Sequence, residues 1–573
     1  MDSLQFAVYL VIGLVTIVVA GLFGRRLGIA APLILIVIGA AFSFIPGAPV
    51  HVPAEFILIA LLPPILYSAA ITVPVIDFRR NFASIGLLSV LLVVATTFVT
   101  GVLLWAVFPD LSLAAAIAVG AVISPTDAVA ATAIAKRFGL PPRLVTILEG
   151  ESLVNDATAL VLLRSALAAT AAAISFWDAL GDFFFAVSVA IAIGIVVGFV
   201  TVWVRSRLRE PLLDTAISFA VPFIAFIPAE VAGASGVIAV VAAGLYTGHH
   251  APRRLSPQSR AAERANWRSI QFVLENGVFL LMGLELTYVL SGVTEDDLSV
   301  TQAVLLGLLV TAVIIAMRYL FVGPLVLGFR GSIRRAERDQ ERFRAMQSRL
   351  PDGDVPPRWE RRVDLWRRRA QRHDNDLREL RDQGLDWRGG IILGWAGMRG
   401  VVTLAAAQSL PPETPYRPQL VLIAFTVAIV TLLLQGLTLP AVIRMTGVRG
   451  TDATADRRAL ASLLDEMNEA GLQVLEAPVD DEGEAVDAAV VDRVRNDTLV
   501  SAQATWERVE KYDGEPHDSP HERYVTLRRA VLAAERAALL EARSAGSYPS
   551  RILLRAQTML DLEEARLAQF DDD

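Results

Sequence analysis

The stretch EGESLVNDATALVLL (149–163) places two acids and an amide inside an otherwise apolar helical segment. Ser152 and Asp156 are four residues apart and Asn155 lies three after Ser152, so a helix presents these side chains on one face. Glu151 lies five residues before Asp156 and is turned about 140° away from it. A carboxylate, a hydroxyl and an amide oxygen on one face are the ligands that a hard cation requires. The pattern predicts a cation site on that face, with Glu151 in different surroundings.

Other ionisable residues also interrupt apolar segments, where each costs roughly 2.5–3.5 kcal/mol and therefore requires a partner or a function. Arg318, in TAVIIAMRYLFVGP, is the expected partner of Glu151 in a buried structural ion pair. Pro125 predicts an interrupted helix at Ser124. Asp127 then either caps the following half-helix or faces an ion, and the two interpretations are compatible.

Arg399 lies in a second segment that is easily interrupted, GGIILGWAGMRGVVTLAAA. Its glycines favour a broken helix, although close helix packing also explains glycine in membranes. The two broken segments are separated by an odd number of predicted spans and so cross in opposite directions, as inverted repeats do. Arg399 would then supply positive charge where two broken helices present like dipole ends.

Composition shows why these residues stand out. The chain has 573 residues, of which 54% are hydrophobic, and no cysteine. This composition is too apolar for an ordinary soluble protein and excludes disulfides and thiolate metal sites. The N-terminus lacks a basic region and a cleavage site, so we interpret it as a first span and not as a signal peptide.

Segments of about 20 apolar residues, enough to cross a bilayer, recur to about residue 445. We expect about thirteen, near 4–24, 27–45, 53–72, 82–108, 111–135, 143–172, 183–204, 212–231, 234–249, 270–290, 298–328, 388–410 and 417–444. Lys and Arg concentrate in alternate loops, with Arg417 as the exception, which places the N-terminus outside and the C-terminus in the cytoplasm. The predicted fold is an all-α polytopic membrane protein with inverted repeats and two discontinuous crossing helices.

Two charged regions accompany a transmembrane domain predicted over 1–445. The insert at 330–388 has 17 Arg against 12 acids and is interpreted as a cytoplasmic helical hairpin, with binding of anionic lipid headgroups as the alternative. The tail at 446–573 is predicted to be an acidic, helical, cytoplasmic segment, with 14 basic against 27 acidic residues from 450 onward. The sequence gives no reason to expect an enzyme, a cofactor or a nucleic-acid partner, and the tail contains no recognisable sensory output domain.

Four stretches carry a resemblance to a known family: LLPPILYSAA (61–70), AVISPTDAVAATAIAKRFGLPPRLVTILEGESLVNDATALVL (121–162), LENGVFLLMGLEL (274–286) and GMRGVVTLAAA (397–407). The chain resembles bacterial monovalent cation/proton antiporters of the Na⁺/H⁺ exchanger group with an Asn–Asp pair. This resemblance implies a homodimer in the plasma (inner) membrane, with a mobile transport domain on a dimerisation domain. It implies exchange of Na⁺, or Li⁺, for H⁺ in pH and sodium homeostasis.

The resemblance also assigns site residues by position. It implies that Asp156 binds the ion and carries the proton, that Asn155 is the asparagine of electroneutral exchangers, and that Arg399 lies beside the broken helices. The remaining Na⁺ ligands would be Asp127, the main chain of Thr126, and Ser152, while Glu151 and Arg318 would be the family's buried pair. Some relatives have an acid where this chain has Tyr67 and Ser68. A K⁺/H⁺ antiporter is the alternative, and a cation channel would need a continuous pore with rings of charge that are not visible.

Overall fold

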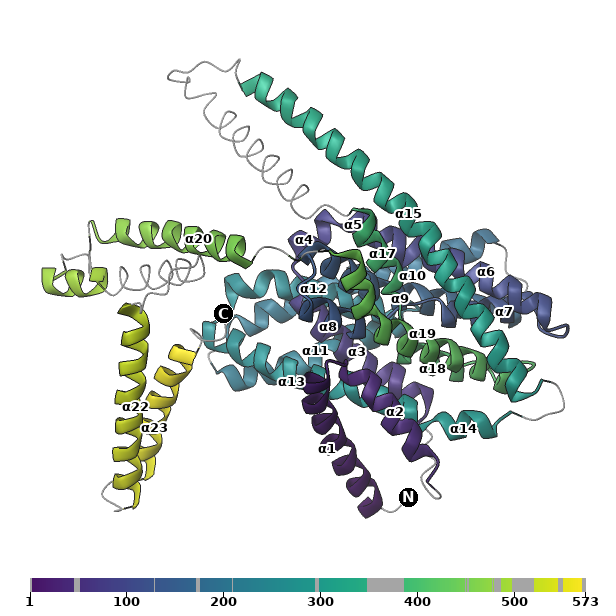
Figure 1. The fold of residues 1–573 in the computed structure, drawn as a ribbon, viewed down its shortest axis with the longest axis horizontal. Coiled ribbons are helices and arrows are strands. Elements are labelled where there is room, and N and C mark those ends of the chain that lie inside the picture. Colours follow the sequence, from purple (N-terminus) through teal and green to yellow (C-terminus); the bar gives the residue numbers. More distant parts are fainter. Residues whose placement is uncertain are drawn as a thin grey trace. The chain divides into compact units, whose positions relative to one another are not determined.

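The computed structural model describes residues 3–45, 52–127, 129–171, 176–208, 210–293, 298–347, 386–448, 450, 453–476, 478, 486–496, 520–544 and 550–568. The chain divides into two compact units, Met1–Gly450 and Thr451–Asp573. All regular elements among the described residues are helices (Figure 1). The first unit contains every residue of the predicted site.

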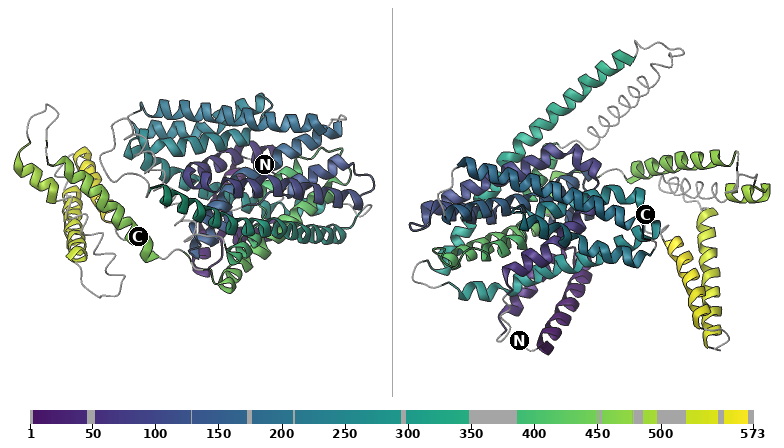
Figure 2. Two further views of the ribbon diagram at one scale, coloured as in Figure 1. Left: turned by 90° about the horizontal axis from the view of Figure 1, so that it is seen from above. Right: turned by 180° about the vertical axis from the view of Figure 1, so that it is seen from behind.

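The first unit is a bundle of helices whose long members lie roughly parallel to one another (Figure 2). Its first part consists of α1 (Ser3–Leu27), α2 (Ala31–Ser43), the π-helix η1 (Phe56–Leu61), α3 (Leu62–Thr72), α4 (Val75–Arg80), α5 (Phe82–Gly86), the π-helix η2 (Leu87–Leu91), α6 (Leu92–Val107), α7 (Leu113–Ile123), α8 (Val129–Arg137) and α9 (Pro142–Ala171). Its second part consists of α10 (Phe176–Arg205), α11 (Pro211–Val231), α12 (Gly236–Arg254), α13 (Pro257–Leu284), α14 (Leu286–Ser291), α15 (Val300–Gln347), α17 (Trp387–Trp395), α18 (Val401–Gln408) and α19 (Arg417–Thr446).

Many of these helices can cross a membrane. Among the described residues, eight segments are long and apolar enough: Ala7–Gly24, Phe82–Val107, Pro142–Thr170, Leu180–Arg205, Pro211–Val231, Pro257–Ser291, Val300–Phe329 and Arg417–Thr446. Three shorter apolar helices, Ala31–Ser43, Phe56–Thr72 and Leu113–Ile123, lie where the sequence predicts further spans. The chain is therefore a multi-pass membrane protein, while the count of thirteen spans stays a prediction.

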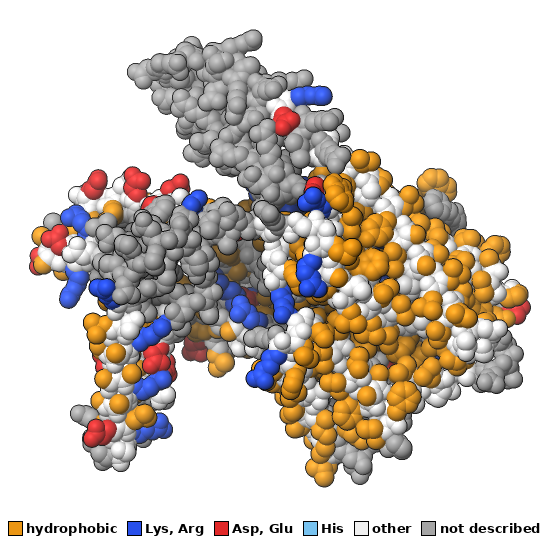
Figure 3. Space-filling view, viewed as in Figure 1, with side chains coloured by type: hydrophobic (Ala, Val, Ile, Leu, Met, Phe, Trp, Pro, Cys, Tyr) orange, Lys and Arg blue, Asp and Glu red, His pale blue; other side chains and the backbone are white. Residues whose placement is uncertain are grey.

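The surface of the first unit fits a bilayer. Figure 3 shows apolar side chains over most of its visible face, with Lys and Arg gathered toward one end. Large side chains such as Leu22, Ile227 and Leu320 are more than half exposed, at 60%, 55% and 63%. Apolar area of this extent in contact with water would be unusual, so this face is suited to lipid.

Two of the predicted spans are interrupted helices. The first stops at Ile123, and its second half, α8, begins at Val129 beyond Pro125. The second stops at Trp395 and resumes at Val401, across the Gly397–Gly400 stretch. The two interruptions lie against each other, because the Asp127 N–H donates to the Met398 carbonyl at 2.7 Å.

Two apolar clusters form the interior of this unit. One is centred on α7, α15, α17, α18 and α19, and the other on α3, α10, α11 and α12. Helix α9 contributes to both, with Leu148 in the first cluster and Leu153 and Ala157 in the second. The polar stretch of α9 thus lies where the two helix groups meet.

Glycines allow several of these helices to touch. A Cβ on Gly120 of α7 would overlap the Thr97 carbonyl of α6, and a Cβ on Gly283 of α13 would overlap the Ile36 carbonyl of α2. Helices in membranes associate through such small-residue contacts because lipid provides no hydrophobic drive between them.

A buried charge cluster that the sequence analysis did not predict connects α10, α11 and α13. Arg205 donates two hydrogen bonds to Asp214, at 2.8 and 2.9 Å, and one to Glu263 at 2.7 Å. Arg205 and Asp214 are almost completely buried, so removing one partner would leave an uncompensated charge. The cluster therefore stabilises the ends of these three helices.

The charged insert at 330–388 begins as part of a span. Helix α15 continues without a break from its apolar part to Gln347, so the first predicted charged helix is its extension. The second charged helix of the predicted hairpin, within residues 348–385, lies outside the described residues.

The second unit, Thr451–Asp573, contains the helices α20 (Ala453–Val474), α22 (Pro520–Ser544) and α23 (Ser550–Ala568). Helices α22 and α23 pack as a pair through Leu532 and Leu567. Arg536 also pairs with Asp561 at 2.7 Å and with Glu564 at 3.2 Å. The parts of the predicted tail that the structure describes are thus mainly helical.

Candidate functional site

Asp156 lies on α9 at the junction of the two helix groups, where it lines a cavity of about 600 Å³. The residue is only 8% exposed, yet its carboxylate makes no hydrogen bond or ion pair with any residue that the structure describes. Ser152, one turn earlier, lines the same cavity. The helical spacing of these two residues therefore places a hydroxyl in the same cavity as an acid that has no partner among the described residues.

The interruption between α7 and α8 forms another wall of this cavity, through Pro125, Thr126 and Asp127. The Asp127 carboxylate accepts the Val129 N–H at 2.8 Å and so caps the start of α8. It also lines the cavity, so its capping role and its exposure to an ion are compatible. Four of the predicted ligands, Thr126, Asp127, Ser152 and Asp156, are brought together around one space.

Asn155 is placed differently from the expected position on the ion's face. Its Nδ2 donates to the Thr126 carbonyl and to Thr126 Oγ1, both at 2.8 Å, and Asn155 is not among the residues that line the cavity. The reason is that adjacent residues on a helix differ by about 100° in direction, so Asn155 and Asp156 meet different neighbours. Asn155 therefore holds the interrupted segment against α9.

Glu151 and Arg318 form a buried pair. Arg318 Nη1 and Nη2 donate to the two Glu151 oxygens at 2.5 and 2.9 Å, and Arg318 Nε donates to the Leu393 carbonyl at 2.9 Å. Thr126 Oγ1 donates to Glu151 at 2.7 Å. The two side chains are 2% and 1% exposed and do not line the cavity. The pair thus connects α9 and α15 with both interrupted segments.

The charges at the two interruptions oppose the local helix dipoles. Arg399 donates to the carbonyls of Ile123, Ser124 and Gly397, at the carboxyl ends of α7 and α17. The Asp127 carboxylate lies at the amino ends of α8 and α18, because it caps α8 and borders Gly400, the residue before α18. A cation therefore faces the partial negative ends and an anion faces the partial positive ends.

Gly400 lies against the Asp127 side chain, so a substitution there tests whether transport depends on the position of Asp127. A Cβ at Gly400 would overlap the Asp127 carboxylate and its Cβ, although the Gly400 backbone, with φ −114°, is one that any residue adopts. We expect Gly400→Ala to displace Asp127 and to lower the rate of cation/proton exchange by about 10-fold to 100-fold, as misplaced ligands do. Gly323→Ala is the matched control, since a Cβ there meets no atom within 4 Å. Equal rates in the two variants would contradict a close fit at Asp127.

The sequence analysis missed Glu275 of α13 and Glu285, which lies between α13 and α14, although both are in its predicted span 270–290. Glu275 lines the cavity and accepts a hydrogen bond from Gln271 at 2.7 Å. Glu285 is buried just after the end of α13, where it accepts hydrogen bonds from the Val52 N–H at 3.1 Å and from Gln408 Nε2 at 2.9 Å. Their position inside an apolar segment was the available signal, as it was for Glu151.

The cavity extends from Asp156 to an ion pair between the last turn of α8 and the early part of α9. Lys136 and Glu149, which pair at 2.7 Å, both line it, and the Lys136 side chain is 65% exposed. Among the described residues, no group of three or more His, Cys, Asp or Glu side chains is arranged to hold a resident metal ion.

Two interrupted helices thus meet beside a buried acid that is reached through a cavity, and the helices around them are apolar enough to cross a membrane. Discontinuous helices that meet within the membrane are typical of secondary transporters, which is the class of protein that this arrangement indicates.

The comparisons with known proteins identify the family within this class. Residues 13–445 match the transmembrane sodium/hydrogen exchanger family. An uncharacterized Na⁺/H⁺ exchanger of Mycobacterium tuberculosis is 30% identical over 99% of this chain and 97% of its own length. The Na⁺/H⁺ antiporter ApNhaP of Aphanothece halophytica is 27% identical over 75% of this chain and 72% of its own. The chain belongs to the sodium/hydrogen exchanger family.

A solved structure shares the fold. The sodium proton antiporter MjNhaP1 of Methanocaldococcus jannaschii superposes with a TM-score of 0.55 at 17% identity, over 78% of this chain and all of that protein. The expected resemblance to cation/proton antiporters is confirmed, and the family is one of transporters and not of enzymes.

Proposed function

We propose that the protein exchanges Na⁺ for H⁺ across the plasma membrane and that Asp156 binds the two ions in turn. The observation that carries this proposal is that Asp156 is buried, lines the cavity and has no hydrogen-bond or ion-pair partner among the described residues. Three other charges buried near it have partners, since Glu151 pairs with Arg318 and Arg399 donates to backbone carbonyls. A buried carboxylate of this kind needs a proton or a cation.

Competition at this carboxylate couples the two fluxes. Asp156 can hold a proton or a dehydrated cation but not both, and Ser152, Asp127 and the Thr126 main chain supply further oxygens for the cation. When Asp156 holds neither a proton nor a cation, the ion site should not move across the membrane, because an uncompensated charge in hydrocarbon is costly. The neutral Asn155 beside Asp156 supports electroneutral exchange, one Na⁺ for one H⁺.

The membrane arrangement completes the proposal. The protein has about thirteen spans, an external N-terminus and a cytoplasmic C-terminus, and acts as a homodimer in sodium and pH homeostasis. The alternation of basic loops supports this topology, and it places the exposed Lys136 end of the cavity toward the cytoplasm.

Potassium is the second candidate for the transported cation. A relative from Bacillus pumilus, 26% identical over 79% of this chain, is named a sodium, potassium, lithium and rubidium/H⁺ antiporter. Selectivity between these ions depends on the distances between the bound ion and its oxygen ligands. A transport measurement with each ion therefore decides between Na⁺ and K⁺.

The test is exchange by purified protein in liposomes with an imposed pH gradient. Na⁺, Li⁺ and K⁺ are titrated while an internal dye reports pH, with the membrane potential either free or clamped. We expect Na⁺ to dissipate the gradient at a rate that the potential does not change. A current that persists without a proton gradient would indicate a channel, and a response to K⁺ alone would select the second candidate.

A further inference from the structure

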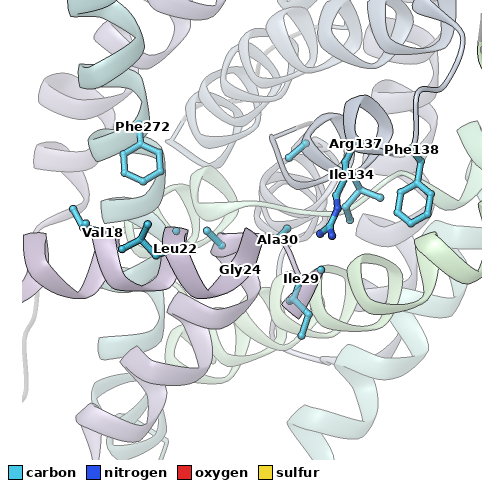
Figure 4. Close-up of a pocket in the computed structure, with 13 residues that line it drawn as sticks. Val18, Leu22, Gly24, Ile29, Ala30, Ile134, Arg137, Phe138 and Phe272 are labelled. Carbon is cyan, nitrogen blue, oxygen red and sulfur yellow. The ribbon is translucent and has the colours of Figure 1, made fainter. Parts of the chain in front are cut away.

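A second cavity of about 600 Å³ lies between α1 and α8, outside the proposed ion site (Figure 4). One side is formed by the end of α1 and the turn to α2, including Leu22 and Gly28, and the other by the end of α8, with Phe272 of α13 beside them. Most of its lining is apolar, and small residues such as Gly21 leave it unfilled.

The position of this cavity along α1 indicates its depth. Val18 and Leu22 belong to the apolar segment Ala7–Gly24 that is suited to the hydrocarbon region, whereas Gly28 lies in the turn that follows. The cavity therefore extends from hydrocarbon depth to the membrane surface. An occupant that matches both ends has an apolar chain and a polar head.

Arg137, the last residue of α8, supplies the polar end. Figure 4 shows its side chain directed toward the turn between α1 and α2. Its Nη2 lies 3.2 Å from the position that a Cβ on Gly28 would take, and the Gly28 φ of +80° also favours glycine there. No described acid pairs with Arg137, whereas the preceding Lys136 pairs with Glu149 at 2.7 Å. An unpaired guanidinium beside an apolar cavity favours an anionic amphiphile.

We propose that this cavity binds an anionic phospholipid of the surrounding bilayer, with one acyl chain along Leu22 and Phe272 and its phosphate on Arg137. Ala31, Ala133 and Phe272 line both this cavity and the ion cavity, so the two cavities are neighbours. A bound lipid therefore contacts α8, whose first turn carries the cap made by Asp127. Occupancy should favour transport, a consequence that rests on the proposed antiport.

Direct binding is measured first, because it does not depend on transport. The full chain is purified in detergent, loaded with phosphatidylglycerol or phosphatidylcholine, and examined by native mass spectrometry. Wild type is expected to retain one more phosphatidylglycerol per subunit than Arg137→Gln, and no excess of phosphatidylcholine. Arg254→Gln is the matched control, since Arg254 is an exposed arginine at the end of α12 that lines neither cavity.

A second variant fills the cavity and leaves the charge in place. Leu22→Trp is suited to this purpose, because Leu22 is 60% exposed and the larger side chain should not disturb the core. It is expected to lose the same phosphatidylglycerol as Arg137→Gln. Equal retention by wild type and both variants would overturn the proposal. A shift of Leu22→Trp from dimer to monomer with unchanged lipid retention would also overturn it, since a second copy of the chain would then cover the cavity.

The transport measurement uses liposomes with and without phosphatidylglycerol. Wild type and Arg254→Gln are expected to be stimulated about fivefold more than Arg137→Gln, the effect of one arginine at an anionic surface. Identical stimulation of all three proteins would contradict the proposed effect on α8. The two proposals can fail separately. If wild type exchanged no cation under any condition, but Arg137→Gln still retained less phosphatidylglycerol than wild type, the antiport proposal would fail and the lipid site would stand.

Discussion

Asp156→Asn is expected to reduce Na⁺-driven proton movement in liposomes to the level of empty vesicles. The amide keeps the size of the side chain but cannot exchange a proton at neutral pH and binds a cation far more weakly than a carboxylate. Asp156 makes no hydrogen bond or ion pair with the described residues, so its replacement removes no stabilising contact. The variant should therefore elute and melt as wild type does while transport is lost.

The control removes an acid that lies outside the cavity. Asp182 is an exposed residue of α10, and Asp182→Asn should exchange Na⁺ for H⁺ at the wild-type rate. Dequenching of an internal pH dye by Na⁺ in Asp156→Asn liposomes, at more than the empty-vesicle rate, would exclude Asp156 as the proton carrier. Loss of transport in both variants would show that removing any one negative charge from the protein is enough to stop exchange, and Asp156 would then have no special role.

The second large effect concerns stability. Glu151→Gln leaves the Arg318 guanidinium buried with only the Leu393 carbonyl and a neutral amide as acceptors. Breaking a buried pair in this way costs about 3–5 kcal/mol, so the melting temperature of the purified protein should fall well below that of wild type. The amide can still accept from Thr126, so the loss reports mainly the ion pair.

Two comparisons make this prediction specific. Arg164 pairs with Glu230 at 2.7 Å, but its side chain is 52% exposed, so Arg164→Gln should cost only about 0–1 kcal/mol. The double variant Glu151→Gln/Arg318→Gln removes both charges and should be more stable than Glu151→Gln alone. Glu151→Gln with the stability of Arg164→Gln would contradict a structural pair, and a large change in apparent Na⁺ affinity without loss of stability would assign Glu151 to the ion site.

Several features could be predicted from spacing along the chain. Pro125 and the glycines before Arg399 indicated where the two helices are interrupted, because proline lacks a backbone donor and glycine weakens a helix. Helix periodicity also separated Glu151 from Asp156, and the cost of a buried charge indicated Arg318 as a partner. The structure contains that pair, with Asp156 alone of the two acids in the cavity.

Other features depend on which helices surround each residue. Asn155 shares a helix with Asp156, but its amide meets Thr126 across the interruption, and only the packing of α7 and α8 against α9 decides that contact. Glu275 enters the cavity from α13, a helix far away in the sequence. Arg205 reaches Glu263 only because the end of α10 lies beside the start of α13.

By itself the sequence determined that the chain crosses a membrane, where its helices break and which charges require partners. These properties follow from hydropathy, backbone chemistry and the period of one helix. Only the tertiary structure decided that Asp156 lines a cavity without a partner among the described residues and that Asp127 and Arg399 face opposite helix ends. It also decided that Arg137 lies beside Gly28 at a second cavity. The physical reason is that a helical period gives the angle between residues on one helix but not the neighbour that each of them meets.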